Sequence, residues 1–430
     1  MKVLLLNQCF YPDVVATAQH LTDLAVGLAG EGHEVTVVAS DRGYDCPSRR
    51  FPRRELWNGI KIIRISSLAL GKQTRWRRAV NFASFLVSCA LRLLLLPRFD
   101  VVLALTSPPL ISLLGALFAR TRGGRFFFWV MDLNPDQAIA AGWLKENSLT
   151  ARVLKKLLRY SLLRAERVVV LDSFMKQRIV AKGIPEKRVT VLPPWGHDDA
   201  VRFDPEGRES FRRQFNLEKS FVVMYAGNHS PCHPLDTLLE AARLLSDGVS
   251  THKQIVFCFV GGGSEQKRVR DFATDHWLEN IICLPYQPLD RLAATLSAAD
   301  LHAVVMGNEF VGIVHPCKLY NVLSIGSPFL YVGPRESHIS EIAAAIAQEP
   351  HNRCRAYTAK NGDVDTVVNS ILEQAKRKLD GEQHCVPEIA NAFSRQKLLP
   401  RLIDVLESQA ITETPIFTPT QIASYMSAKR

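Results

Sequence analysis

The sequence predicts an α/β protein of two domains, each with a parallel sheet that is buried on both faces. Its 430 residues exceed what a single hydrophobic core usually supports. Short continuous apolar runs alternate with helical patterns, as is typical of parallel strands joined by helices. A stretch rich in proline and glycine interrupts this alternation once, and the alternation then begins again.

The first domain opens with a strand, a helix and a second strand. Residues 3–6 are a short apolar run, residues 17–29 have helical periodicity, and residues 34–39 are a second apolar run. Gly30 and Gly32 stand at the helix exit, where glycine is favoured. Further strands are expected at 60–65, 101–104, 126–130, 167–171 and 189–192. Together these elements predict an N-terminal Rossmann-like domain over 1–198.

The second domain repeats the pattern after an interdomain linker, which we expect at 199–216 because Pro205 and Gly207 break periodicity there. Strands are then expected at 221–225, 255–260, 281–284, 301–305 and 329–332, and helices at 234–245, after Gly263 and around Lys318. This predicts a second Rossmann-like domain over 217–380. A helical segment is expected at 381–410, and the sequence leaves open whether it packs back on the first domain. Residues 411–430 are expected to be a loose tail.

Composition and charge limit the environment and the partners. The nine cysteines are scattered without a CxxC pair or zinc-type spacing, which indicates buried thiols in a reducing, cytoplasmic compartment and no metal centre. The apolar run at the N-terminus is too short for a signal peptide. A net charge of +11 favours anionic partners: nucleic acid, acidic lipid headgroups or phosphorylated substrates.

A basic segment precedes an apolar one in the first domain. Lys72, Arg75, Arg77 and Arg78 lead into residues 79–96, which Asn81 and Arg92 interrupt, so a membrane-spanning helix is not expected. The pattern suits a helix lying on the anionic inner face of the cytoplasmic membrane, and a core helix with a solvated basic start is the alternative. Further arginines could join this surface: Arg49, Arg50, Arg53 and Arg54. Aromatic platforms for nucleic acid are missing, so nucleic acid binding is not expected.

Several motifs resemble the family 4 glycosyltransferases of GT-B fold. The first half carries Phe10-Tyr11-Pro12 and the run from Gly32 to Val37. The second half carries Tyr225-Ala226-Gly227-Asn228, Val260-Gly261-Gly262-Gly263, Leu284-Pro285-Tyr286, Ala298-Ala299-Asp300-Leu301 and the run from Pro316 to Pro328. The likeness extends to about residue 345 and is greatest to the subgroup that builds bacterial exopolysaccharides, such as the colanic-acid-type transferases.

The resemblance implies a donor site in the second domain. Glycines at the strand ends let the backbone approach a diphosphate, although an ordinary turn would also favour them. Lys318 could neutralise the leaving diphosphate, and a solvated lysine is the alternative. The expected donor-binding residues are Thr17, Ala18, Gly227, Asn228, His229, Gly261, Gly262, Gly263, Tyr286, Glu309, Lys318 and Asn321.

The chain departs from the family pattern at several of these positions. Two glutamates that many members carry eight positions apart are replaced by Ile313 and Asn321, and Glu309 lies nearby. Asn228, His229 and His233 stand where an arginine and a lysine are usual, and Thr17 and Ala18 replace paired glycines.

The acceptor side is expected in the first domain, at the carboxyl end of the predicted strand 126–130. Asp132 and Asp136 follow that strand, at the sheet edge where open α/β folds place their sites. The alternative is helix capping by Asp136 or Asn134. Gln19 and His20 could also bind the acceptor, and Asp132 and Lys318 are the expected catalytic residues.

The function implied by the resemblance is retaining transfer of a sugar from a nucleotide-sugar, with UDP as the expected nucleotide, to a lipid-linked or polysaccharide acceptor. No cofactor or metal is expected, because no DxD-like pair lies in a fitting loop and Lys318 with backbone amides can replace the ion. Two alternatives remain: a degenerate GT-B protein that binds a glycan or a partner without catalysis, and a nucleotide-sugar epimerase of the same fold.

Overall fold

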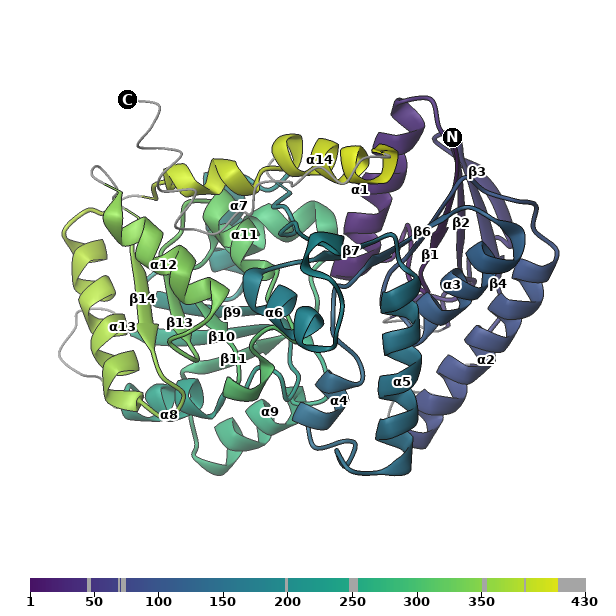
Figure 1. Ribbon diagram of the computed structural model, residues 1–430. Coiled ribbons are helices and arrows are strands. Elements are labelled where there is room, and N and C mark those ends of the chain that lie inside the picture. The colour runs from purple at the N-terminus through teal and green to yellow at the C-terminus, as the bar shows by residue number, and fades with distance from the viewer. Residues whose placement is uncertain are drawn as a thin grey trace. The chain divides into compact units, whose positions relative to one another are not determined.

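The computed structural model describes residues 1–44, 48–68, 70, 75–197, 200–246, 254–349, 354–382 and 384–408 (Figure 1). The chain divides into two compact units. Of the described residues, the first contains Met1–Pro193, Gly312–His315 and Leu398–Ser408, and the second contains Pro194–Val311 and Pro316–Lys397. Lys72, Asp198, Asp199 and the predicted tail lie outside the described residues.

The first unit is built on an eight-stranded sheet of order β3-β4-β2-β1-β5-β6-β7-β8. Its strands are β1 Lys2–Leu6, β2 Glu34–Ser40, β3 Arg54–Trp57, β4 Ile60–Ile65, β5 Val101–Ala104, β6 Arg125–Trp129, β7 Arg167–Val170 and β8 Val189–Val191. All pair in parallel except β3, which is antiparallel to β4. The sequence did not predict β3, because this four-residue edge strand is half exposed and has no apolar run.

The helices of this unit are α1 Ala16–Gly30, α2 Arg75–Leu94, α3 Ile111–Arg122, α4 Asp136–Ala140, α5 Leu149–Arg164 and α6 Ser173–Ala181. Gly115 lets α3 lie close to the sheet, since a Cβ there would stand 2.8 Å from the ring of Phe126. Ser148 caps α5 by accepting a hydrogen bond from the amide of Ala151. Among the described residues, no helix is both long and apolar enough to cross a membrane.

Helix α14, Arg395–Glu407, belongs to the first unit from Leu398 onward and packs against α1. A Cβ at Gly27 of α1 would stand 3.0 Å from Cδ1 of Ile403. The guanidinium of Arg125 donates hydrogen bonds to the carbonyls of Leu406 and Ser408, which would otherwise be unpaired at the helix end. The sequence left packing on the first domain open for the whole segment 381–410, but the residues up to Lys397 belong to the second unit.

The second unit is built on a six-stranded parallel sheet of order β11-β10-β9-β12-β13-β14. Its strands are β9 Phe221–Asn228, β10 Ile255–Gly262, β11 Ile281–Leu284, β12 Leu301–Val305, β13 Phe329–Val332 and β14 Ala356–Ala359. Its helices are α7 Pro205–Gln214, α8 Asp236–Leu244, α9 Gln266–Asp275, α10 Leu292–Ser297, α11 Lys318–Ser324, α12 His338–Gln348 and α13 Val364–Leu379. The sequence did not predict β14, a short edge strand that is largely half exposed.

The linker predicted at 199–216 is wrong, because most of it is helix α7 of the second unit. Pro205 is the first residue of α7, and Asp204 caps the helix by accepting from the amide of Gly207. Proline is favoured in the first turn of a helix, so the residue that suggested a break is a start signal. The boundary between the units lies at Pro193 and Pro194, before the expected position 198.

An internal ion-pair cluster anchors α7. Arg208 and Arg212 bind the carboxylate of Asp300, which also accepts from the amide of Val222. Burial by itself would raise the pKa of Asp300, but the two guanidiniums and the amide outweigh it and the pKa falls. Asp300 is part of one of the motifs that carry the resemblance. Its carboxylate is used to fix α7 in place and is therefore not a ligand-binding group.

Candidate functional site

The ends of β9 and β10 lie side by side as parallel neighbours in the second unit. Gly227 pairs with Gly261 and Asn228 with Gly262, so both strands run further than predicted. A Cβ at Gly261 would stand 2.0 Å from the Gly227 carbonyl oxygen, and one at Gly263 would stand 2.1 Å from that of His229. Strand packing alone therefore requires these glycines, and the edge they form presents bare backbone.

Lys318 is the first residue of α11, and its ammonium group lies next to this glycine edge. Nζ lies 3.5 Å from the centroid of the Tyr225 ring, and a Cβ at Gly227 would stand 3.0 Å from Nζ. Nζ is buried, and within the described residues it has no hydrogen-bond partner and no ion pair. Burial lowers the pKa of Lys318 to about 7. The predicted alternative, a solvated lysine, is wrong.

Two histidines lie beside this lysine and add no positive charge at neutral pH. Burial and the charge of Lys318 lower the pKa of His229 to about 4 and that of His233 to about 3. Nδ1 of His233 carries its proton, since it donates a 2.7 Å hydrogen bond to the carbonyl of Val305. Nearby, the hydroxyl of Tyr225 donates to the carbonyl of Asn228.

This arrangement is suited to an anion. A buried ammonium without a counter-ion is unfavourable, and a phosphate group at the bare glycine edge would supply the missing negative charge. The neutral histidines could donate or accept hydrogen bonds there, but they would add no positive charge. The strongly lowered pKa of Lys318 next to such an edge is typical of functional sites.

The other predicted donor residues have varied surroundings. Tyr286 is partly exposed, with its ring edge 2.9 Å from where a Cβ of Gly262 would stand, and Asn228 is exposed. Glu309 is exposed and has no ion pair among the described residues. The side-chain oxygen of Asn321 accepts a 3.0 Å hydrogen bond from the amide of His197. Asn321 thus stabilises the backbone at the start of the second unit.

Thr17 and Ala18 belong to the first unit, in the first turn of α1. Ala18 is fully buried in the core, so its side chain does not face a ligand. The structure describes both residues as helical, which explains why this chain does not need the glycines expected in a loop there.

Asp132 is the principal candidate in the first unit. It follows β6 at the carboxyl edge of the sheet, between the buried residues Met131 and Leu133. Its side chain has no hydrogen bond or ion pair within the described part of the chain. Burial raises its pKa to about 6. Asp132 is therefore a carboxyl group that can change protonation state near neutral pH.

Asp136, unlike Asp132, has a partner among the residues that the structure describes. Its Oδ1 lies 2.6 Å from Nζ of Lys182, at the end of α6, and both side chains are largely buried. Asp136 opens α4, and no side-chain capping bond is formed at this helix. The alternative of helix capping is thus wrong for Asp136, and its charge is used in an ion pair that joins α4 to α6.

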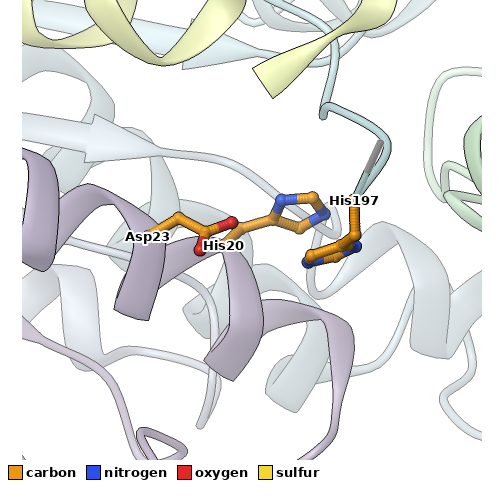
Figure 2. Close-up of side chains that lie close together, drawn as sticks. All are labelled: His20, Asp23 and His197. Atoms are coloured by element: carbon orange, nitrogen blue, oxygen red, sulfur yellow. The ribbon is translucent and has the colours of Figure 1, made fainter. Parts of the chain in front are cut away.

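Gln19 and His20 lie on α1, as expected. The side chain of Gln19 donates a hydrogen bond to the carbonyl of Val14, within the turn that precedes the helix. His20 is buried, with its ring centroid 6.5 Å from that of Trp129. Figure 2 shows His20 and Asp23 on α1, and its third labelled residue, His197, belongs to the second unit.

A buried contact between a carboxylate and a histidine in the first unit was not predicted. Asp172 caps α6 through the amide of Met175, and its other oxygen lies 2.8 Å from Nδ1 of His315. The carbonyl of Ile313 accepts from the amide of Leu133, next to Asp132. Residues Gly312–His315 are therefore part of the first unit, directly before the helix that carries Lys318. Asp172 could have been found as a polar residue after a predicted strand, but its partner could not.

A group of possible metal ligands also lies within the first unit. Glu31, His33 and Glu407 have ligand atoms close enough to share a cation. Nε2 of His33 already lies 2.7 Å from Glu407, and Nδ1 lies 3.1 Å from the amino group of Met1. These contacts join α14 to the start of β2, and we assign no metal to the group.

Comparison with known proteins identifies the family. Residues 16–195 match the family model described as Glycosyl transferase 4-like domain, and residues 207–316 match Glycosyl transferases group 1. The putative colanic acid biosynthesis glycosyl transferase WcaI of Escherichia coli (strain K12) is 25% identical over 374 residues, which cover 82% of this chain and 89% of the relative. The chain belongs to the family 4 glycosyltransferases. The predicted family and enzyme class are confirmed.

Solved structures confirm the GT-B fold of this glycosyltransferase. WaaG, a glycosyltransferase involved in lipopolysaccharide biosynthesis, has a TM-score of 0.67 at 15% identity, with 94% of this chain and all of that chain covered. HepE of Anabaena, in complex with UDP and glucose, has a TM-score of 0.66 at 15% identity, with both chains covered completely. At this level of identity the likeness concerns the fold.

Proposed function

We propose that this glycosyltransferase moves a sugar from a nucleotide-sugar, with UDP as the nucleotide, to a lipid-linked or polysaccharide acceptor in the synthesis of a cell-surface glycan. The proposal rests on the buried ammonium of Lys318, which lies next to the glycine edge and has no counter-ion within the described part of the chain. The names of WcaI and WaaG support a role in glycan synthesis, and the UDP and glucose bound to HepE support a UDP-sugar as the donor.

Lys318 is proposed to bind the diphosphate that leaves with the nucleotide. A nearby anion raises the pKa of a buried ammonium, so the donor would hold Lys318 in its charged form. The charge that develops on the leaving diphosphate would then be stabilised in a site with little water. We propose that no metal ion is needed for this step, since Lys318 and backbone amides supply the compensating charge.

Asp132 is proposed to contact the acceptor. With a pKa of about 6, it is mostly ionised at neutral pH and can accept a hydrogen bond from the attacking hydroxyl. In the retaining transfer that we propose, this hydroxyl attacks from the face that the nucleotide leaves. Positioning the hydroxyl is then the main contribution of the first unit.

A second candidate function is a degenerate, non-catalytic GT-B protein. Two observations favour it: Ile313 stands at a usual glutamate position, and Asn321 at the other is bonded to the backbone of His197. A nucleotide-sugar epimerase is a further enzyme option and would convert the donor without any acceptor.

A thermal-shift titration with UDP, GDP, ADP and their sugar conjugates tests the proposal, because a ligand that binds only the folded state raises its stability. We expect selective stabilisation by UDP and UDP-sugars. The shift should disappear in Lys318→Met and persist in Lys267→Met, whose lysine is 83% exposed on α9.

Transfer to a lipid-linked acceptor, with retained anomeric configuration, would complete the support. Absence of a shift with every nucleotide would refute the proposal and favour the degenerate protein. Conversion of the UDP-sugar without an acceptor would favour the epimerase.

A further inference from the structure

The chain that follows β2 forms a hairpin at the carboxyl edge of the sheet in the first unit. β2 ends at Ser40, and Arg42 and Arg50 then pair in an antiparallel bridge. The amide of Gly43 donates a 3.0 Å hydrogen bond to the carbonyl of Arg49. Open α/β folds place their ligands at this edge, and the proposed function uses no side chain of the hairpin. We call its described residues, 41–44 and 48–53, the arginine hairpin.

The arginine hairpin carries positive charge that no described acid neutralises. Arg49, Arg50 and Arg53 are exposed, and none of them forms an ion pair with the residues that the structure describes. Asp41, the only acid among the described residues of the hairpin, is buried and accepts a hydrogen bond from the hydroxyl of Ser66. Guanidinium groups without an acidic partner attract an anion, and they bind a carboxylate or a phosphate through paired hydrogen bonds.

Arg64 of β4 connects the hairpin to the loop that follows β1. Its buried guanidinium donates to the carbonyl of Tyr11 and to the carboxylate of Glu55. Cζ of Arg64 lies 5.3 Å from the centroid of the Phe51 ring, and Cζ of Arg49 lies 5.4 Å from it. The charge of Arg64 is therefore used inside the fold, whereas the charge of Arg49 stays available at the surface beside it.

Two aromatic rings are stacked next to Arg64. The ring centroids of Tyr11 and Trp57 are 4.1 Å apart, and the ring planes differ by 15°. Trp57 belongs to β3, and both side chains are half-buried, so the pair reaches the surface. Aromatic faces pack against the apolar C–H faces of pyranose rings, while the polar edges of the rings stay in water. Tyr11 belongs to the motif Phe10-Tyr11-Pro12, to which the proposed function gives no role.

We propose that the arginine hairpin and the Tyr11–Trp57 pair bind the acceptor, and that this acceptor has an anionic group on a pyranose ring. The sugar would pack against the aromatic pair, and its carboxylate or phosphate would bind Arg49 and Arg53. A neutral sugar would not use the arginines, and an inorganic anion would not use the rings. The inference rests on the proposed function and deepens it, because it names the chemical class of the acceptor.

The arginine hairpin and Asp132 lie at different places along the same sheet edge. The hairpin follows β2 and Asp132 follows β6, with β1 and β5 between these strands. Neighbouring strands are ~4.8 Å apart, so three spacings separate the two regions by roughly 14 Å. A single pyranose does not span this distance. The anionic sugar is therefore not the one that carries the attacking hydroxyl, but one further along a longer acceptor.

Isothermal titration calorimetry of the full chain tests the proposal. The probes are a hexuronic acid oligosaccharide, a neutral oligosaccharide of the same length, the 1-phosphate of that neutral oligosaccharide, and inorganic phosphate. We expect at least one anionic oligosaccharide to bind about tenfold more tightly than the neutral one and than inorganic phosphate. Preference for the hexuronic acid would indicate an acidic polysaccharide acceptor. Preference for the 1-phosphate would indicate the phosphate-linked end of a lipid-linked acceptor.

Two sets of variants separate the charge from the rings. Arg49→Gln with Arg53→Gln should weaken binding of the preferred anionic oligosaccharide about tenfold at low salt and much less at high salt. Trp57→Leu should weaken binding of the same oligosaccharide about tenfold, and Trp57→Phe should restore most of the affinity because it keeps an aromatic face. Restoration by phenylalanine distinguishes loss of the ring from damage to β3, and thermal unfolding of each variant checks the fold.

Matched controls change residues of the same types elsewhere. Arg152→Gln with Lys156→Gln removes two exposed charges from α5 of the same unit, and Trp277→Leu removes an exposed tryptophan of the second unit. Both controls should bind the oligosaccharides as the wild type does. An equal loss in the controls would overturn the proposal, as would equal affinity for the neutral and the anionic oligosaccharides, or unchanged binding in the arginine and Trp57→Leu variants.

Nucleotide thermal shifts of the same variants separate this inference from the proposed function. The arginine and Trp57 variants should keep the UDP shift of the wild type, since the donor site lies in the second unit. Binding of an anionic oligosaccharide without any nucleotide shift would refute the proposed function and leave the sugar site intact. A nucleotide shift without binding of either anionic oligosaccharide would refute only the sugar site.

Discussion

The glycine edge of the second unit and the carboxyl edge of the first unit each hold a charged group without a partner among the described residues, and the edge of the first unit also holds a paired one. Lys318 has no counter-ion, and Asp132 has neither a hydrogen bond nor an ion pair, among the residues that the structure describes. Asp136, four positions after Asp132, is paired with Lys182. A buried charge that the fold compensates is structural, whereas one that it leaves uncompensated is the better candidate for binding a substrate.

The largest expected effect is on turnover. Lys318→Met should lower kcat/KM for sugar transfer by ~10²–10³-fold, because it removes a charge that stabilises the leaving diphosphate. Steady-state kinetics with a UDP-sugar would measure this, with Lys267→Met as the control. Loss of a buried unpaired charge should leave thermal stability unchanged or higher. A stable Lys318→Met variant with full activity would contradict the role of the lysine.

Substitution of the two aspartates should have different effects: loss of activity for Asp132 and loss of stability for Asp136. Asp132→Asn should lower kcat by ~10²-fold, within the range for a positioned acid–base group, without loss of stability. In the unaltered enzyme, activity should fall as pH drops through about 6, where Asp132 becomes protonated.

Asp136→Asn should instead destabilise the protein by about 1–3 kcal/mol, since Lys182 loses its partner, and should retain most of the activity. Urea unfolding together with pH–rate profiles distinguishes the two variants. If Asp136→Asn lost more activity than Asp132→Asn, the distinction between compensated and uncompensated carboxylates would be wrong.

Substitution at the glycine edge should destabilise the fold even when no ligand is bound. Gly261→Ala would place a Cβ against the carbonyl of Gly227 at a φ of +135°, and should destabilise the protein by about 1–3 kcal/mol. Gly30→Ala is the matched control, because no heavy atom lies within 4 Å of its Cβ position at the end of α1. Urea denaturation of the two variants would show whether packing or the ligand requires the glycine.

The smallest expected effect is a proton linkage at Lys318. Its pKa of about 7 in the fold is below the ordinary value of 10.5, so the unfolded chain binds more protons between these values. Stability should therefore rise as pH increases from about 7 to 10.5, and this contribution should be missing in Lys318→Met. Donor binding should take up a proton, so UDP affinity should weaken above pH 7, by about tenfold per unit at most. Calorimetry in buffers of different ionisation enthalpy would detect the uptake, and zero uptake would contradict the linkage.

Much of the fold could be predicted because parallel strands need continuous apolar runs and their connecting helices need apolar periodicity. Both sheets were located in this way, and β4, β5, β11, β12 and β13 begin and end at the predicted residues. The strands that were missed, β3 and β14, are edge strands whose half-exposed residues carry no such pattern. The linker was misplaced because Pro205 can begin a helix as well as break one.

The sequence by itself determined the two-unit α/β architecture, the family, and the positions of Lys318 and Asp132 at strand or helix ends, since these follow from local patterns and motifs. Only the tertiary structure decided which charges are compensated. The pairing of Asp136 with Lys182, of Asp172 with His315 and of Asp300 with α7 joins residues far apart in the chain. Burial and charge partners are properties of the packed fold, so no local pattern encodes that Lys318 has no charge partner in the described part of the structure.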